Sequence, residues 1–426
     1  MTDSQKSHIA RIGHRLKALP RKLPVLTAWG ESSDESLARH YDAGLSIPVC
    51  DQTTEETEGA RLREKGRFMA RQEMWDELGG MIRNHDHSRE ATPGGTALAD
   101  LLSYGARSDV VLPVETALSD PGLMSAHAPR EGMIALEEVL QDHPDDYGVA
   151  LVVAQAHVDI GWAWRGQGWI SEVPEKHWEA FHRHFDRAEE ILDRFDAFAE
   201  DSPALAAARC ALLASTPAPK ARVADDYEDL IDLDPGNPRH MRGLGNHLLP
   251  RWFGSYEQLE LEARRTAART GDIWGAGAYT WVYLDALAVD PVALGHLDVP
   301  FFLDGMRDIL THRPDQHYAN QMAAFCAVTL QQPRYGRAPD SQGLREIRAA
   351  LDWILRDHLT ELHPLVWGVA AKGAQHATGP LARDEVARLG RDCALARIGR
   401  HFDAELRRGM RVVFDRTGPH LEPMDG

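Results

Sequence analysis

The residues best suited to chemistry in this chain are histidines and aspartates gathered between positions 157 and 186. His182 and Asp186 stand four positions apart, on one face of a helix, a spacing that suits either a shared metal ion or an ordinary hydrogen bond. No single helix face offers three ligands, so a metal or acid–base site requires His157 or Asp159 from the preceding helix. The alternative, which we favour, is that these side chains are hydrogen-bonded parts of the core and surface.

The sequence His85-Asp86-His87 also offers two imidazoles and a carboxylate, which are ligands for transition metals. Successive residues of a helix point about 100° apart, so the three side chains converge only in a loop or a strand. We interpret the segment as the polar end of a helix, ahead of the Gly- and Pro-rich turn at residues 92–96.

The common enzyme signatures are missing from the sequence. It contains no GxxxxGK[ST] phosphate loop, no GxGxxG after a strand, no GxSxG and no HExxH. These absences argue against those enzyme classes. We therefore expect no cofactor and no resident metal, and a non-catalytic protein rather than an enzyme.

Residues 161–171 interleave tryptophans, glycines and one arginine. Because glycine disfavours helix interiors, we expect an irregular insertion between helices, spanning residues 161–176. Indole and guanidinium groups are enriched at interaction hot spots, which favours a binding loop. The alternative is a structural plug, in which the tryptophans are buried and the arginine pairs with an acid. The residues concerned are Trp162, Trp164, Arg165 and Trp169.

A second aromatic segment covers residues 250–256. Ser255 is expected to cap the helix that begins at Tyr256, with Gln258 completing a capping box. Arg251 has no such structural explanation, so we add Arg251 and Trp252 to the candidate partner contacts.

Apolar residues recur with helical period over most of the chain, and alternating strand patterns are nearly absent. Proline stands in four polar turns between helical segments, where it ends one helix and suits the first turn of the next. These turns contain Pro144, Pro203, Pro235 and Pro314. The pattern predicts an all-α protein built of antiparallel helical hairpins.

Pro203 and Pro235 stand 32 positions apart, close to the 34-residue tetratricopeptide period, although the other intervals are irregular. Between residues 132 and 330 the chain resembles the tetratricopeptide (TPR) superfamily, whose repeats commonly end in a turn like Leu233-Asp234-Pro235-Gly236-Asn237. The resemblance implies a TPR-like superhelix.

Residues 159–169 (DIGWAWRGQGW) and 249–256 (LPRWFGSY) resemble a bacterial family with TPR-like helices. Relatives more often carry Pro-Arg-Trp-Gly-Gly-Ser in the second segment, so Phe253 is a departure. The resemblance implies a fold and no established activity.

We expect four regions along the chain. Residues 1–95 form an N-terminal helical region and residues 96–330 the TPR-like array. Residues 331–343 form a linker or loop, and residues 344–426 form C-terminal helices with a frayed tail beyond Thr417.

Charge and composition limit the partners. The formal net charge is −18, from 65 acidic against 47 basic residues, so the chain as a whole repels nucleic acid and anionic membranes.

No apolar run reaches the roughly 18 residues that a transmembrane helix needs. Residues 1–23 read as a basic amphipathic helix rather than a secretory signal. Four dispersed cysteines without a CxxC pair favour the cytoplasm.

The sequence favours a binding or scaffold protein that recognises a protein or peptide partner, because helical-hairpin solenoids present an extended concave face. One alternative is a metal-dependent or acid–base enzyme using His157, Asp159, His182 and Asp186. Another is a component of a bacterial toxin–immunity or secretion system. The partner and the oligomeric state stay undefined.

Overall fold

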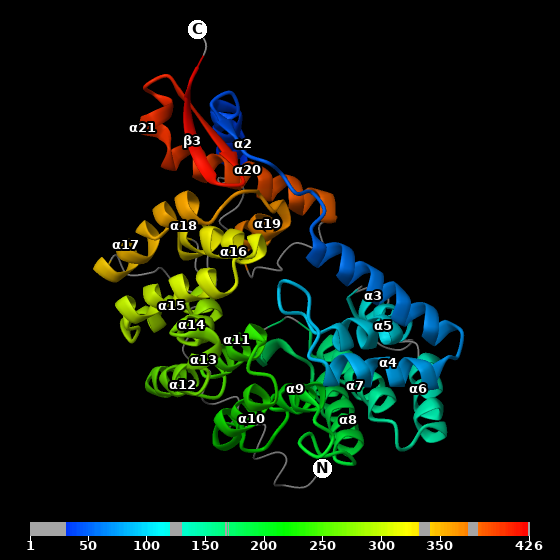
Figure 1. The fold of residues 1–426 in the computed structure, drawn as a ribbon. Helices are drawn as coiled ribbons and strands as arrows, with labels where there is room; N and C mark the ends of the chain where they lie inside the picture. Colours follow the sequence, from blue (N-terminus) through cyan, green and yellow to red (C-terminus); the bar gives the residue numbers. More distant parts are fainter. Residues whose placement is uncertain are drawn as a thin grey trace. The chain divides into compact units, whose positions relative to one another are not determined.

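The computed structural model describes residues 31–119, 130–166, 168, 170–331, 341–373 and 382–424. Helices make up most of these residues, as expected (Figure 1). The predicted basic helix at residues 1–23 lies outside the described part, as does most of the expected linker at 331–343. Among the described helices, none is both long enough and apolar enough to cross a bilayer.

The chain divides into two compact units. Unit 1 comprises residues 55–240, and unit 2 comprises residues 31–54 together with residues 241–424. Helices on both sides of residue 95 pack together within unit 1. The four regions expected from the sequence stay a prediction. The helices of unit 1 are α3 (Thr54–Arg71), α4 (Trp75–His87), α5 (Leu98–Ser119), α6 (Glu131–Asp142), α7 (Tyr147–Arg165), α8 (Glu175–Leu192), α9 (Pro203–Leu212) and α10 (Pro219–Leu233), with a 3₁₀ turn at Ile170–Glu172.

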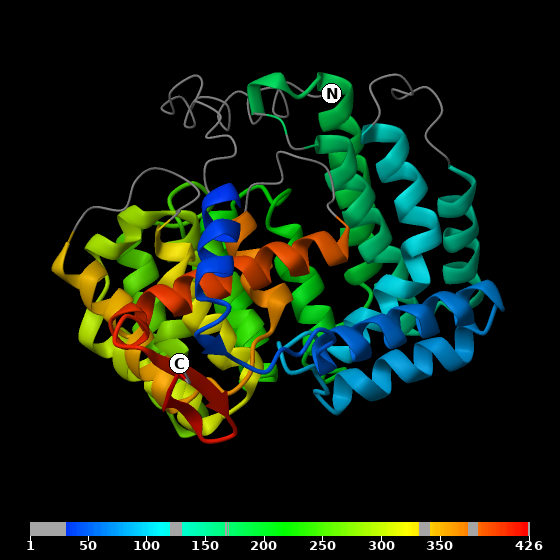
Figure 2. The same ribbon diagram turned by 90° about the horizontal axis from the view of Figure 1, so that it is seen from above.

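Helix α7 is the centre of unit 1. It packs against α4, α5, α6, α8 and α9, and its residues 149–154 are completely buried. A helix enclosed on all sides needs apolar residues around its whole circumference, which explains the run of valine, alanine and leucine there. In Figure 2, the blue helices α3 and α4 run crosswise to the cyan and green helices α5, α7 and α8.

Glycines permit the closest crossing in unit 1. A Cβ placed on Gly66 of α3 would meet the Leu102 carbonyl oxygen at 2.1 Å, and one on Gly105 of α5 would meet the Arg63 carbonyl oxygen at 2.0 Å. The two backbones therefore touch directly, which only glycine allows.

Unit 2 is also built mainly of helices. Neighbouring elements such as α14 and α15, or α19 and α20, pack against each other. Its elements are α2 (Glu31–Tyr41), β1 (Leu45–Ser46), α12 (Tyr256–Arg269), α13 (Gly271–Trp274), α14 (Gly277–Val289), α15 (Val299–His312), α16 (Gln316–Ala327), α17 (Gln342–Ala349), α18 (Leu351–Asp357), α19 (Pro364–Lys372), α20 (Arg383–His401), α21 (Asp403–Leu406), β2 (Met410–Asp415) and β3 (Gly418–Pro423), with 3₁₀ turns at Pro291–Gly295 and Thr329–Gln331. Helix α11 (Pro238–His247) spans the boundary between the units.

A three-stranded sheet in unit 2 corrects the expectation of a frayed tail. The strand order is β1-β2-β3, with β1 parallel to β2 and β3 antiparallel to it. Val412 and Phe414 alternate inward and are buried, and the Phe414 ring lies 6.0 Å from that of Phe402. Gly418 supports the turn between the strands, because its φ of +103° is one that other residues rarely adopt.

All four predicted proline turns are confirmed. They separate α6 from α7, α8 from α9, α10 from α11, and α15 from α16. At the start of each following helix, a side chain accepts a hydrogen bond from a backbone N–H group. The acceptors are Asp146 for α7, Ser202 for α9, Asn237 for α11 and Asp315 for α16. Proline and a capping side chain are therefore sufficient to set where these helices begin.

The expected insertion at residues 161–176 is wrong in its first five residues, because α7 continues to Arg165. A Cβ on Gly161 would lie 2.9 Å from the Phe185 ring, so this glycine serves the contact between α7 and α8 rather than breaking the helix. The helix ends at Gly166, where φ is +64°. The irregular segment therefore begins five residues later than the composition suggested.

Candidate binding site at the end of α7

The last turn of α7 carries two of the predicted contact residues out of the core. Trp162 is 36% exposed, although it follows a stretch of helix that is almost wholly buried. Its indole packs edge-on against Phe181 and Phe185 of α8, with ring centroids 5.3 and 5.8 Å away. The two phenylalanine rings of α8 thus hold the Trp162 indole in place, while part of its surface faces solvent.

Arg165 lies beside this tryptophan at the end of the helix. Its Nη1 donates hydrogen bonds to the carbonyl oxygens of Gly166 and Gly168, at 2.8 and 2.7 Å. Its Cζ lies 5.8 Å from the ring centroid of Trp178, within the range of a cation–π contact. We call Trp162, Arg165 and Trp178 together the α7 tip.

The Arg165 guanidinium has an unusual electrostatic environment. Burial lowers the pKa of Arg165, and no carboxylate among the described residues offsets that effect. The structural-plug interpretation expected Arg165 to pair with an acid. In the described structure its recorded hydrogen bonds instead go to loop carbonyls.

Trp164 fits the structural interpretation better than the binding one. It is partly buried against the core of unit 1, and its ring meets His177 edge-on at 5.2 Å. Trp169 lies outside the described residues. The predicted tryptophan set therefore divides into a packed member and an exposed member.

Arg251 and Trp252 lie in unit 2, in the turn before α12. Trp252 is 40% exposed, and the Arg251 Cζ lies 5.9 Å from its ring centroid. Phe253 stacks on His247 at 5.6 Å. Ser255 accepts a hydrogen bond from the Gln258 N–H at 3.2 Å, so the predicted N-cap is confirmed.

His157 belongs to a polar cluster between α6, α7 and α8, which we call the histidine cluster: Glu137, His157, His184 and Arg187. The His157 Nε2 lies 2.8 Å from a Glu137 oxygen, and its Nδ1 lies 2.8 Å from the His184 Nδ1. Arg187 donates two hydrogen bonds to the Glu137 carboxylate, at 2.8 and 2.6 Å. Both ring nitrogens of His157 are thus occupied.

This geometry shifts the acid–base equilibria of the histidine cluster. Hydrogen bonds from Arg187 and His157 lower the pKa of Glu137 to about 2. Burial, with help from the neighbouring His157, lowers the pKa of His184 to about 4. At neutral pH the glutamate is ionised and His184 is neutral.

The other residues proposed for a metal site lie apart from His157. Asp159 accepts a hydrogen bond from the Arg107 Nε at 2.6 Å. The His182 Nδ1 lies 3.2 Å from the Ser215 hydroxyl, and Asp186 is exposed. In the described structure, therefore, His157, Asp159, His182 and Asp186 do not form a common ligand set.

His85 to His87 are the end of α4, as predicted, and Asp86 joins it to its neighbours. Asp86 accepts hydrogen bonds from the Ser202 hydroxyl, from the Ala204 N–H at 2.9 Å and from the Tyr147 hydroxyl at 3.3 Å. Burial raises the pKa of Asp86, and these hydrogen bonds oppose the rise. Asp86 thereby links the end of α4 to α7 and to the start of α9.

Sequence spacing did not indicate one further set of residues. Cys50, Glu361 and His363 of unit 2 offer ligand atoms that all lie within 4.8 Å of one another. Among the described residues they are the one such group of three. The local signal was a glutamate and a histidine two positions apart, which share a side in extended backbone. No local pattern indicates that Cys50 lies beside them.

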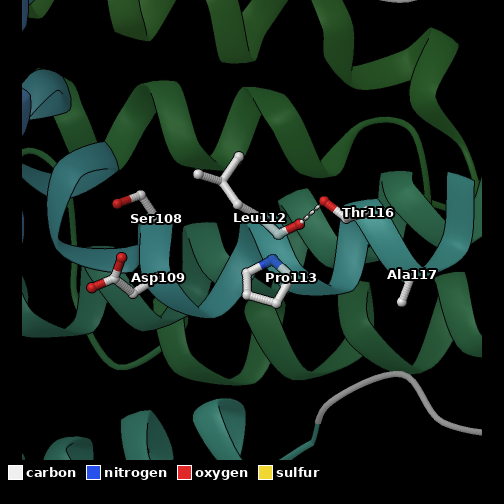
Figure 3. A pocket seen from close by; sticks show the side chains of 6 residues that line it. All are labelled: Ser108, Asp109, Leu112, Pro113, Thr116 and Ala117. Carbon is white, nitrogen blue, oxygen red and sulfur yellow. Dashed lines mark hydrogen bonds between the residues drawn. The ribbon is translucent and has the colours of Figure 1, made fainter.

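A hollow of about 480 Å³ lies along the outer face of α5 (Figure 3). Its lining comes from that helix alone, and the Thr116 hydroxyl donates to the Leu112 carbonyl within it. Asp109, its acidic member, is bonded to Arg71 at 2.5 and 3.0 Å. The hollow therefore offers no convergent catalytic groups among the described residues.

No known family model matches this chain, and no curated protein and no solved structure resembles it at a significant level.

Proposed function

We propose that this protein is a non-catalytic binding protein of the TPR-like type, and that the α7 tip contacts a protein or peptide partner. The observation that carries this proposal is the pairing of an exposed, rigidly supported Trp162 with a partly buried Arg165. Tryptophan and arginine dominate the energetics of protein interfaces, especially where packing already fixes them.

The TPR-like architecture is part of the proposal. It is supported by the confirmed proline turns and by the packing of consecutive helices such as α7 with α8 and α9 with α10. Helical hairpins that stack in sequence expose side chains at their ends and along one face. The end of α7 is such a position.

The chemistry of the α7 tip defines the kind of partner. Arg165 has five N–H donors, and its hydrogen bonds to other described residues all come from Nη1. With respect to the described residues, the N–H groups of Nε and Nη2 are therefore open to a ligand. Trp162 offers an apolar face. A peptide that places a carboxylate or backbone carbonyl next to an aromatic or aliphatic side chain would satisfy both residues.

Selection from a displayed random-peptide library, followed by fluorescence anisotropy with the selected peptides, tests this function. We expect Trp162→Ala and Arg165→Ala each to weaken binding by at least tenfold, about 1.4 kcal/mol. Phe198→Ala is the matched control, because it removes another exposed aromatic residue of unit 1 and should leave affinity unchanged. Equal binding by all variants, or failure to select any peptide, would contradict the proposal.

A further inference from the structure

In unit 2, two distant segments of extended backbone lie side by side. The Cys50 N–H donates to the Leu362 carbonyl, and the Leu362 N–H donates to the Pro48 carbonyl, both at 2.8 Å. Leu362 is completely buried. Since alternate residues of extended backbone point to opposite sides, Glu361 and His363 share the side away from Leu362.

Two amide side chains of α16 hold this backbone in place. The Gln316 Oε1 accepts from the N–H groups of Thr360 and Glu361, at 2.9 and 3.3 Å. The Asn320 Oδ1 accepts from the His363 N–H, and its Nδ2 donates to the Glu361 carbonyl, both at 2.9 Å. The positions of Glu361 and His363 are thus fixed by the fold, without help from a ligand.

His363 carries an unsatisfied atom. Its side chain is only 7% exposed, and its Nε2 lies 3.0 Å from a Glu361 carboxylate oxygen. Its Nδ1 is buried and has no hydrogen-bond partner in the described structure. Leaving such a nitrogen unsatisfied costs about 1–3 kcal/mol, so the site is incomplete as it stands.

We propose that Cys50, Glu361 and His363 bind a divalent transition-metal ion of the zinc type. A thiolate, an imidazole and a carboxylate are the ligands that zinc takes in proteins, whereas magnesium and calcium select oxygen ligands. The three groups already lie within 4.8 Å of one another. Small side-chain movements bring them to bonding distances of about 2.0–2.3 Å.

The geometry also indicates what kind of metal site this is. Three protein ligands leave one position of a tetrahedron for water or another small ligand. The Glu361 side chain is 39% exposed and Cys50 is partly exposed, so solvent reaches the site. The Cys50 thiol, which donates to the Gln52 carbonyl at 3.6 Å, releases its proton when its sulfur binds the ion.

Titration of the purified, metal-stripped full chain with cobalt(II) tests the proposal. We expect one equivalent to bind with a thiolate-to-cobalt charge-transfer absorption, and zinc to displace it. Cys50→Ser should abolish that absorption. His363→Gln and Glu361→Gln should each weaken cobalt binding by at least tenfold.

Matched controls are Cys210→Ala and His358→Gln, which remove a thiol and an imidazole from other places and should bind cobalt as the wild type does. Glu361→Gln changes a partly exposed side chain and keeps the proposal testable if the buried His363 variant does not fold. The proposal fails if the wild type gives no charge-transfer absorption, if Cys50→Ser retains it, or if Glu361→Gln binds unchanged. None of these measurements involves the α7 tip, so they are independent of the proposed peptide binding.

Discussion

Each unit of this protein contains a glutamate paired with a largely buried histidine, yet the two pairs differ in what surrounds them. In the histidine cluster of unit 1, His157 lies 2.8 Å from Glu137 and its second nitrogen contacts His184. In unit 2, His363 lies 3.0 Å from Glu361 and its second nitrogen has no partner in the described structure.

This difference distinguishes His157, which has a structural role, from His363, which we propose as a metal ligand. Hydrogen bonds satisfy the buried polar atoms of His157, and Arg187 neutralises the glutamate charge beside it. His363 has a buried nitrogen without a partner in the described structure, and one of its ring nitrogens lies within 4.8 Å of ligand atoms of Glu361 and Cys50. The number of satisfied atoms, rather than the number of nearby histidines, indicates which group binds a ligand.

Replacing each glutamate by alanine should give the largest difference in stability between the two units. Glu137→Ala leaves Arg187 and His157 without their shared acceptor, and we expect unit 1 to lose about 3 kcal/mol of stability. Glu361→Ala, without metal, should cost under about 1 kcal/mol because its side chain is partly exposed. Native-state hydrogen exchange of α7 and α19 amides measures the two effects separately. Similar losses in both units would break the comparison.

The pH dependence of stability should show the next largest effect. The pKa of His184 falls from its ordinary value of 6.5 to about 4 on folding, so the unfolded chain binds more protons between these values. Stability should therefore fall by about 2 kcal/mol as the pH decreases from 6.5 to 4. Glu137, with a pKa of about 2, adds a further loss between about 4.5 and 2.

Urea denaturation at pH 7 and pH 4.5 measures this dependence. His184→Gln should remove the loss of stability that occurs between about pH 6.5 and pH 4, because glutamine does not titrate. His312→Gln is the control, since His312 is exposed and its Nδ1 lies 2.8 Å from the Asp308 carbonyl oxygen of its own helix. If His184→Gln retained the full slope, His184 would not be the group responsible.

The smallest expected effect concerns the packing that holds the histidine cluster together. The Cβ of Gly161→Ala would lie 2.9 Å from the Phe185 ring and 3.4 Å from the His184 Cβ. Overpacking should cost about 1–3 kcal/mol, partly offset by the better helix propensity of alanine, for a net loss of about 1 kcal/mol. Gly271→Ala meets nothing within 4 Å and should not destabilise the protein. Thermal melting of both variants checks this pair.

The sequence predicted the features that depend on neighbouring residues. The helix boundaries at Pro203 and Pro314 follow from proline geometry and local caps, and the Ser255 cap follows from its spacing to Gln258. Composition alone misplaced the end of α7, because Gly161 is explained by Phe185 on the next helix. The small sheet was missed because its longer strands span only six residues each.

The candidate sites show the same limit. Trp162 and Arg165 were predicted from a contiguous motif, whereas the different role of Trp164 depends on its contact with His177. The set of Cys50, Glu361 and His363 was not predictable, because over 300 residues separate the cysteine from the other two. Only tertiary pairing of the two segments makes them one site.

The topology of the sheet has a consequence for the order in which the protein is made. Strand β1, near residue 45, pairs in parallel with β2, which begins at Met410. Unit 1 lies between these strands in sequence and can assemble while later codons are still being translated. Residues 31–54 are therefore synthesised long before their partners in unit 2. During most of synthesis β1 is an unpaired strand edge, which chaperones are suited to shield.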